Sequence, residues 1–155
     1  MSFAKRILYV DLTTGKTEVK PLNEKLAKEY IGGIGLGMKL WLDHSNAGVD
    51  AFSPENPLIF MTGPLTGTMA PSAGNSYAVV SKSPLTGTIG ESKAHGFFGS
   101  EIKRAGYDAI IFTGKSEKLV DRMRGRRENA AQWCMLSFFV LYRGMNEPEI
   151  YFKSF

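Results

Sequence analysis

The chain has almost no cysteine, since Cys134 is its only one. A single thiol cannot form an internal disulfide, and it cannot supply the several thiolates that an iron–sulfur cluster requires. The chain also lacks long hydrophobic runs, and its first residues lack the hydrophobic region of a signal peptide. These absences exclude a disulfide scaffold. They predict no membrane partner and make the cytoplasm the expected compartment.

A concentrated charge of one sign is missing as well. The 19 basic and 15 acidic residues are interleaved through most of the 155-residue chain and leave a net charge of +4. Because nucleic-acid binding needs a strongly basic surface, this pattern predicts no nucleic-acid partner. The exception is a cluster of four arginines, Arg122, Arg124, Arg126 and Arg127. A basic patch that binds nucleic acid is the less favoured interpretation of this cluster.

The apolar content is sufficient for one hydrophobic core. Hydrophobic residues make up 43% of the chain, and a domain of this length buries roughly two-thirds of the surface of its unfolded chain. We expect one domain over residues 1–120 and a tail, residues 121–155, that packs as an irregular helix or is poorly ordered. Cys134 lies in an apolar stretch of this tail and is interpreted as a buried small hydrophobe.

A repeated pentapeptide, Pro-Leu-Thr-Gly-Thr, occupies residues 64–68 and 84–88, the first and second turn motifs. Each copy follows a β-rich run and is typical of a turn, because proline presets its own φ and glycine tolerates positive φ. Its hydroxyls and exposed N–H groups also suit an anion such as phosphate. Two copies indicate either a duplicated unit or a paired rim around one site.

Hydrophobic periodicity and turn residues predict a mixed α+β domain. A hairpin is expected over residues 6–12 and 17–20, and Asn23 is the expected N-cap of the first helix. Gly32 and Gly33 are expected to end that helix, and Gly106 to end the last one. The predicted helices cover residues 24–31, 34–44 and 100–105, and the other predicted strands cover residues 58–61, 77–80 and 108–114.

Two glycine-containing patterns fail as nucleotide-binding motifs. Residues 33–38 and 35–40 lack the sixth-position glycine of the dinucleotide fingerprint, because Met38 and Leu40 stand there. Residues 113–116 lack the earlier glycine of a P-loop, because Ala109 stands in its place. We interpret residues 32–37 as a helix joint or a close packing surface in preference to a ligand contact.

The two histidines invite different interpretations. His44 lies near an expected helix end, which favours a capping or solvated side chain over a catalytic one. His95 lies in a glycine-bounded loop beside Lys93. There it contacts an anion, moves a proton or only bonds to backbone, and all three interpretations stay open. We assign no catalytic residue.

Several blocks of the sequence together resemble one known family. They are residues 6–15 (RILYVDLTTG), 30–33 (YIGG) and 52–56 (FSPEN), the two turn motifs with Lys82 and Ser83 before the second, and residues 96–99 (GFFG) and 105–111 (AGYDAII). In order and spacing they are similar to the N-terminal domain of the tungsten-containing aldehyde:ferredoxin oxidoreductases. The resemblance extends over residues 4–120.

The resemblance implies a β-rich domain of two intertwined structural repeats, which forms the base for a tungsten bis-pterin (molybdopterin-type) cofactor with a bridging magnesium. The implied cofactor-binding residues are Asn75, Ser76, Lys93, Ala94 and His95. The family often has arginine at the position of Ser76 and asparagine, which helps hold the magnesium, at that of Lys93. An ammonium group binds phosphate but cannot ligate a metal, so we expect no metal ligand among these residues.

In whole enzymes of this family, an aldehyde is oxidised to an acid and the electrons pass to ferredoxin through a 4Fe–4S cluster. The cluster cysteines and the proton-transfer groups belong to later domains, and the residues after Lys118 diverge from the family. We therefore expect a truncated chain that is inactive alone. The alternative is a non-catalytic binding or assembly module that forms a homo-oligomer through apolar surface left open by the missing domains.

Overall fold

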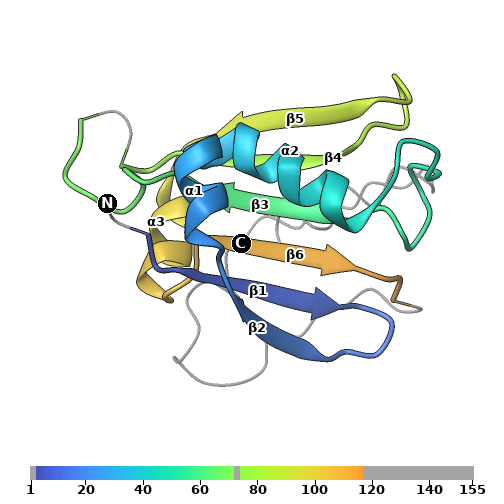
Figure 1. Ribbon diagram of the computed structural model, residues 1–155, viewed down its shortest axis with the longest axis horizontal. Helices are drawn as coiled ribbons and strands as arrows, with labels where there is room; N and C mark the ends of the chain where they lie inside the picture. Colours follow the sequence, from blue (N-terminus) through green and yellow to red (C-terminus); the bar gives the residue numbers. More distant parts are fainter. Residues whose placement is uncertain (1–2, 72–73, 117–155) are drawn as a thin grey trace, which may run out of the picture.

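The computed structural model describes residues 3–71 and 74–116, which form one six-stranded mixed sheet with three short helices (Figure 1). The prediction of an α+β domain is confirmed. The tail and Cys134 lie outside the described residues. In chain order the elements are β1 (Arg6–Asp11), β2 (Thr17–Pro21), α1 (Glu24–Tyr30), α2 (Gly33–His44), β3 (Leu58–Thr62), β4 (Tyr77–Lys82), β5 (Ile89–Ala94), α3 (Phe97–Arg104) and β6 (Ala109–Thr113).

The strands are ordered β2-β1-β6-β3-β4-β5 across the sheet. β1 and β2 form the predicted hairpin, β1 pairs with β6 in parallel, and the other neighbouring pairs are antiparallel. The parallel pair places the first described strand, β1, beside the last, β6. Parallel neighbours need a long crossover connection, and here the crossover contains all the elements between these two strands. The N-terminal hairpin is therefore part of the same sheet as the strands that carry the turn motifs.

Strand β5 is not among the strands predicted from the sequence, which assigned no helix or strand to residues 89–94. It pairs with β4 along its whole length, with Tyr77 opposite Ala94 at one end. Its middle residues are exposed. An edge strand is held by backbone bonds to one neighbour and needs no alternating apolar pattern, so a search for alternation misses it. Helix α3 likewise begins earlier than predicted, at Phe97.

The helices divide the core into two clusters, one on each face of the sheet. Helices α1 and α2 cover one face, and α3 covers part of the other (Figure 1). Helix α2 approaches the sheet closely at Gly37, where a Cβ would lie 2.9 Å from Cγ2 of Val80. The glycine-rich stretch thus serves packing, the interpretation preferred from the sequence. None of the helices described is long and apolar enough to cross a bilayer.

The ends of the first two helices follow from local side chains. The Asn23 side chain accepts a hydrogen bond from the Lys25 N–H group at 2.9 Å, which confirms the predicted N-cap. His44 Nδ1 lies 2.7 Å from the Leu40 carbonyl oxygen, so this ring closes the last turn of α2. Ile31, predicted as the last residue of the first helix, instead follows α1 as its C-cap, with a φ of 64°, and its side chain is exposed.

The turn between β1 and β2 contains a carboxylate that should respond to acid. The Thr14 hydroxyl donates to Asp11 Oδ2 at 2.7 Å and the Thr13 N–H group donates to Oδ1 at 2.9 Å, and these bonds lower the pKa of Asp11 below its usual value. Because the folded state has the lower pKa, the turn's stabilisation is present above the unfolded pKa of about 4 and is lost as the pH falls through the folded pKa. In an NMR titration, the midpoint of the Asp11 carboxyl should rise in Thr14→Val. A midpoint that does not move would contradict this account.

Candidate functional site

The two turn motifs lie at opposite ends of the sheet (Figure 1). The first follows the end of β3 and the second follows the end of β4, and these neighbouring strands are antiparallel, with Phe60 opposite Val79. The hypothesis of a paired rim around one site is therefore wrong, and the duplicated unit remains as the alternative. Both glycines adopt the expected positive φ, 79° at Gly67 and 68° at Gly87.

Only the first turn motif is tied to a neighbouring strand by a buried threonine. The Thr66 hydroxyl accepts a hydrogen bond from the Gly63 N–H group at 3.0 Å and donates one to the Ser76 carbonyl oxygen at 2.8 Å. The counterpart Thr86 is exposed, and its hydroxyl lies 3.0 Å from that of Thr88. The first motif thus fixes the segment that enters β4, where two of the implied cofactor-binding residues lie.

Ser76 and His95 meet at this end of the sheet. The register of β4 and β5 sets Tyr77 opposite Ala94, so the residues just beyond the pair, Ser76 and His95, come together. Ser76 Oγ lies 3.0 Å from His95 Nδ1. The contact leaves the His95 Nε2 atom directed away from Ser76, and both side chains are at least partly accessible. A hydroxyl and an imidazole from segments far apart in sequence are therefore combined at one point.

The other implied residues surround this pair in different ways. Asn75 is exposed beside Ser76, and Lys93 is exposed on β5 opposite Ala78. The side chain of Ala94 instead packs against the core on the α3 face, so Ala94 offers a ligand only its backbone groups. Helix α3 begins just after His95. Its N-cap residue is Gly96, which has no side chain to cap the first N–H groups of the helix.

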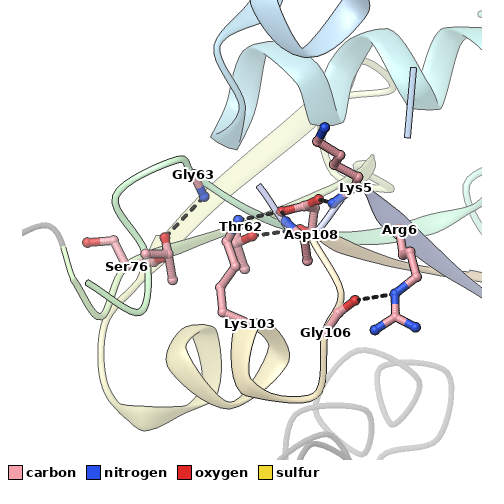
Figure 2. Close-up of polar contacts among 10 residues, drawn as sticks. Lys5, Arg6, Thr62, Gly63, Ser76, Lys103, Gly106 and Asp108 are labelled. Carbon is pink, nitrogen blue, oxygen red and sulfur yellow. Dashed lines mark hydrogen bonds and ion pairs between the residues drawn. The ribbon is translucent and has the colours of Figure 1, made fainter. Parts of the chain in front are cut away.

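The buried carboxylate of Asp108 lies at the same end of the sheet as Ser76 (Figure 2). Asp108 is fully buried, and its carboxylate accepts hydrogen bonds from the Ala4 and Lys5 N–H groups at 3.0 and 2.6 Å. It also forms an ion pair with the almost fully buried Lys103 on α3. Its carbonyl oxygen accepts bonds from both the N–H group and the hydroxyl of Thr62, at 2.9 and 2.7 Å. Asp108 therefore joins the N-terminal segment, the end of β3 and α3.

Sequence reasoning did not single out Asp108. The available signal was an acidic residue directly before a strongly apolar run, because a charged side chain at the start of a buried strand requires a partner. Its partner Lys103 lies five residues earlier, on the helix that precedes the strand. The bonds to Ala4 and Lys5 span more than a hundred residues and have no sequence signal.

The donors at the site suit an anion better than a metal ion. The Ser76 hydroxyl, the His95 ring and the Lys93 ammonium group can all donate hydrogen bonds to phosphate oxygens. In the described parts of the chain, no group of three or more His, Cys, Asp or Glu side chains lies close enough together to hold a metal ion. The residues present thus fit the phosphate groups of a large anionic cofactor and provide no side-chain carboxylate or amide cage for magnesium.

Comparison with known proteins gives matches over most of the described chain. The family of the aldehyde ferredoxin oxidoreductase N-terminal domain matches residues 7–122. The tungsten-containing aldehyde ferredoxin oxidoreductase of Pyrococcus furiosus is 50% identical over 115 residues, which are 74% of this chain and 19% of that protein. The WOR-like subunit of an aliphatic sulfonate oxidoreductase from the same organism is 40% identical over 118 residues, 74% of this chain and 18% of that subunit.

A solved structure gives a similar result. The active-site complex BamBC of benzoyl coenzyme A reductase, in complex with 1,5-dienoyl-CoA, matches with a TM-score of 0.74 and 33% identity. The match covers 96% of this chain and 24% of that one. The chain spans about a fifth of the length of the curated relatives that it matches.

Proposed function

The chain belongs to the aldehyde ferredoxin oxidoreductase N-terminal domain family, and from this premise we propose that it is the cofactor-binding domain of a tungsten pterin oxidoreductase. The observation that carries the proposal is the contact between Ser76 and His95. It brings together two of the residues that the family resemblance implies, one directly before β4 and one directly after β5, beside a first turn motif that holds Ser76 in place.

The site residues would hold the phosphates of the cofactor. Lys93 supplies a positive charge, Ser76 and His95 supply hydrogen bonds, Asn75 supplies a side-chain amide, and Ala94 supplies backbone groups. When bound, a tungsten pterin cofactor supplies the two-electron redox chemistry that converts an aldehyde to an acid. Because Lys93 cannot ligate magnesium, a bridging magnesium would take its protein ligands from backbone carbonyls or from other parts of a whole enzyme.

The remaining functions of a whole enzyme lie outside this chain. We propose that the 4Fe–4S cluster, the ferredoxin contact and the aldehyde pocket belong to the four-fifths of the relatives that this chain does not span, so that the chain alone is inactive. Relatives named for aldehydes, aliphatic sulfonates and benzoyl-CoA all contain this domain. Because these names refer to different substrates, they favour a role in binding a cofactor and not in selecting a substrate. The single thiol is in keeping with the cytoplasm as the compartment.

Inorganic pyrophosphate is a suitable probe of the phosphate-binding role. In an NMR titration of the 155-residue chain, we expect shifts of the backbone amides of residues 75–76 and 93–97. Lys93→Ala and His95→Ala should each weaken binding by roughly one to two orders of magnitude, since a hydrogen bond to a charged group contributes about 1.5–3 kcal/mol. Lys16→Ala is the matched control, because Lys16 is an exposed lysine on the β1–β2 turn.

The control separates a specific site from general attraction to a basic protein. If Lys16→Ala weakens pyrophosphate binding as much as Lys93→Ala does, or if the shifts spread evenly over the surface, the phosphate site is not where we place it. Both lysines are exposed, so neither substitution should alter the fold.

A second candidate function is self-association, the binding or assembly role considered above. The observation that favours it is the presence of large apolar side chains that are mostly exposed, among them Met69 and Phe97. Exposed apolar patches in a soluble domain commonly mark interaction surfaces.

A further inference from the structure

Asn75 differs from the other asparagines of the described chain in how its side-chain amide is held. An asparagine loses ammonia when the backbone nitrogen of the next residue attacks its side-chain carbonyl carbon, so a fixed amide or a missing N–H group prevents the reaction. The side-chain oxygens of Asn23 and Asn46 each accept a hydrogen bond from the N–H group two residues later, at 2.9 Å. Asn56 is followed by Pro57, which has no backbone N–H group.

None of these protections applies to Asn75. It is exposed in the loop that leads from β3 to β4, and within the described residues no hydrogen bond holds its side chain. The next residue is Ser76, whose small side chain hinders its own backbone nitrogen little. The Thr66 hydroxyl donates to the Ser76 carbonyl oxygen at 2.8 Å. The backbone after Asn75 is therefore fixed, while the Asn75 side chain can turn toward the attacking nitrogen.

A group that can carry protons lies beside this nitrogen. Ser76 Oγ is 3.0 Å from His95 Nδ1, so the imidazole ring contacts the residue that makes the attack. The reaction needs one proton to be removed from the Ser76 N–H group and one to be delivered to the departing ammonia. An imidazole can do both near neutral pH, because it gains and loses a proton in that range.

We propose that Asn75 is a deamidation site and that the His95 imidazole carries the protons of the reaction. A bond forms between the Ser76 nitrogen and Asn75 Cγ, and the bond from Cγ to the side-chain nitrogen breaks. Ammonia leaves with the proton of the Ser76 N–H group, and a cyclic succinimide remains. Water then opens the ring at either carbonyl and gives aspartate or isoaspartate. Water is the only other reactant.

The product places a negative charge at the candidate anion site. Residues 56–81 contain no Asp, Glu, Lys or Arg, and Lys93 is the only such residue in 92–100. A carboxylate at position 75 would repel phosphate and offset the charge of Lys93, because like charges that are brought together disfavour binding. This consequence rests on the phosphate-binding role proposed above. The affinity of the chain for phosphate should therefore fall with time.

Peptide mapping by mass spectrometry tests the conversion in the 155-residue chain after incubation at mildly alkaline pH. Residues 40–81 contain no Lys or Arg, so trypsin releases Asn46, Asn56 and Asn75 in one peptide, and fragmentation shows which of them has changed. We expect Asn75 to convert about tenfold faster than Asn46, because the hydrogen bond at Asn46 must break first. Asn56 should not convert.

The part played by the imidazole is tested in His95→Gln. His95 is exposed, so the fold should be kept. Conversion of Asn75 should slow several-fold, and conversion of Asn46 in the same peptide should not change. Equal rates at Asn75 and Asn46 in the natural chain would overturn the proposed site. An unchanged rate at Asn75 in His95→Gln would overturn the role of the imidazole.

The effect on the anion site is measured with Asn75→Asp, which has the charge of the product. It should weaken pyrophosphate binding about tenfold. Asn46→Asp is the matched control, since Asn46 is exposed on a loop that Lys82 contacts at the other end of β4. Equal effects of the two substitutions would contradict the proposed consequence. If the natural chain binds no pyrophosphate, the phosphate-binding role fails, whereas conversion of Asn75 is still measured on the peptide.

Discussion

Replacing Asp108 with alanine is expected to lower the free energy of unfolding by about 3–5 kcal/mol, as loss of one partner of a buried ion pair does. The substitution leaves the Lys103 ammonium group almost fully buried without its carboxylate, and it removes the acceptor of the Ala4 and Lys5 N–H groups. Urea denaturation followed by circular dichroism measures the change. Since small domains are stable by about 5–15 kcal/mol, a loss of this size should move the denaturation midpoint to a clearly lower urea concentration.

An exposed ion pair on α2 provides the matched control. Asp43 pairs with Lys39, and both side chains are partly accessible to water. Asp43→Ala should therefore cost at most about 1 kcal/mol. If Asp108→Ala and Asp43→Ala have equal effects, the buried pair does not support the fold as described.

A second variant separates the buried charge from the lost hydrogen bonds. Lys103→Met in the Asp108→Ala background removes the ammonium group that has lost its carboxylate but keeps an apolar stem of similar length. We expect it to restore part of the lost stability, because a buried positive charge that has lost its counter-ion is more costly than an apolar side chain. No recovery would mean that the backbone bonds of the N-terminal segment carry the whole effect.

The sequence predicted the elements that depend on local signals. The N-cap at Asn23 needs only its own side chain and the following turn, and the first hairpin needs only two adjacent β-rich runs. Strand β5 was not predictable in this way, because its evidence is the pairing with β4 and not its own pattern. The ends at which the two turn motifs lie also depend on strand direction, which neither motif encodes.

The candidate site shows the same limit. Ser76 and His95 were named from the family resemblance, but their contact follows from the register between β4 and β5, which the sequence did not reveal. Asp108 was missed because its partners include residues at the opposite end of the described chain. The bounds of the domain and of the tail are not tested by the described residues and stay predictions.

Asn56, within the FSPEN block, is the centre of a second, partly buried polar network, at the opposite end of the sheet from the candidate site. Its side-chain oxygen accepts hydrogen bonds from the indole N–H group of Trp41 at 3.0 Å and from the Lys82 N–H group at 3.2 Å. Its amide nitrogen donates to the carbonyl oxygens of Ala51 and Lys82, at 2.8 and 3.3 Å. One side chain therefore joins α2, the loop after it and the end of β4.

Asn56→Leu, which keeps the size of the side chain, is expected to lower the free energy of unfolding by about 2–4 kcal/mol. The main reason is that Trp41 is fully buried, so its indole N–H group loses its acceptor where no water replaces it. Urea denaturation measures the effect. Asn46→Leu is the matched control, since the side chain of the exposed Asn46 accepts a hydrogen bond from the N–H group of Gly48 in its own loop, and the substitution should cost about 1 kcal/mol or less.

A double-mutant cycle tests whether the indole is the reason. In a Trp41→Phe background the N–H group is absent, so Asn56→Leu should cost about 1–2 kcal/mol less than it does in the natural chain. Equal costs in the two backgrounds would show that the bonds to Ala51, Ser81 and Lys82, and not the bond to Trp41, make Asn56 important. The cycle thus separates a side chain that anchors a buried aromatic ring from one that extends the edge of β4.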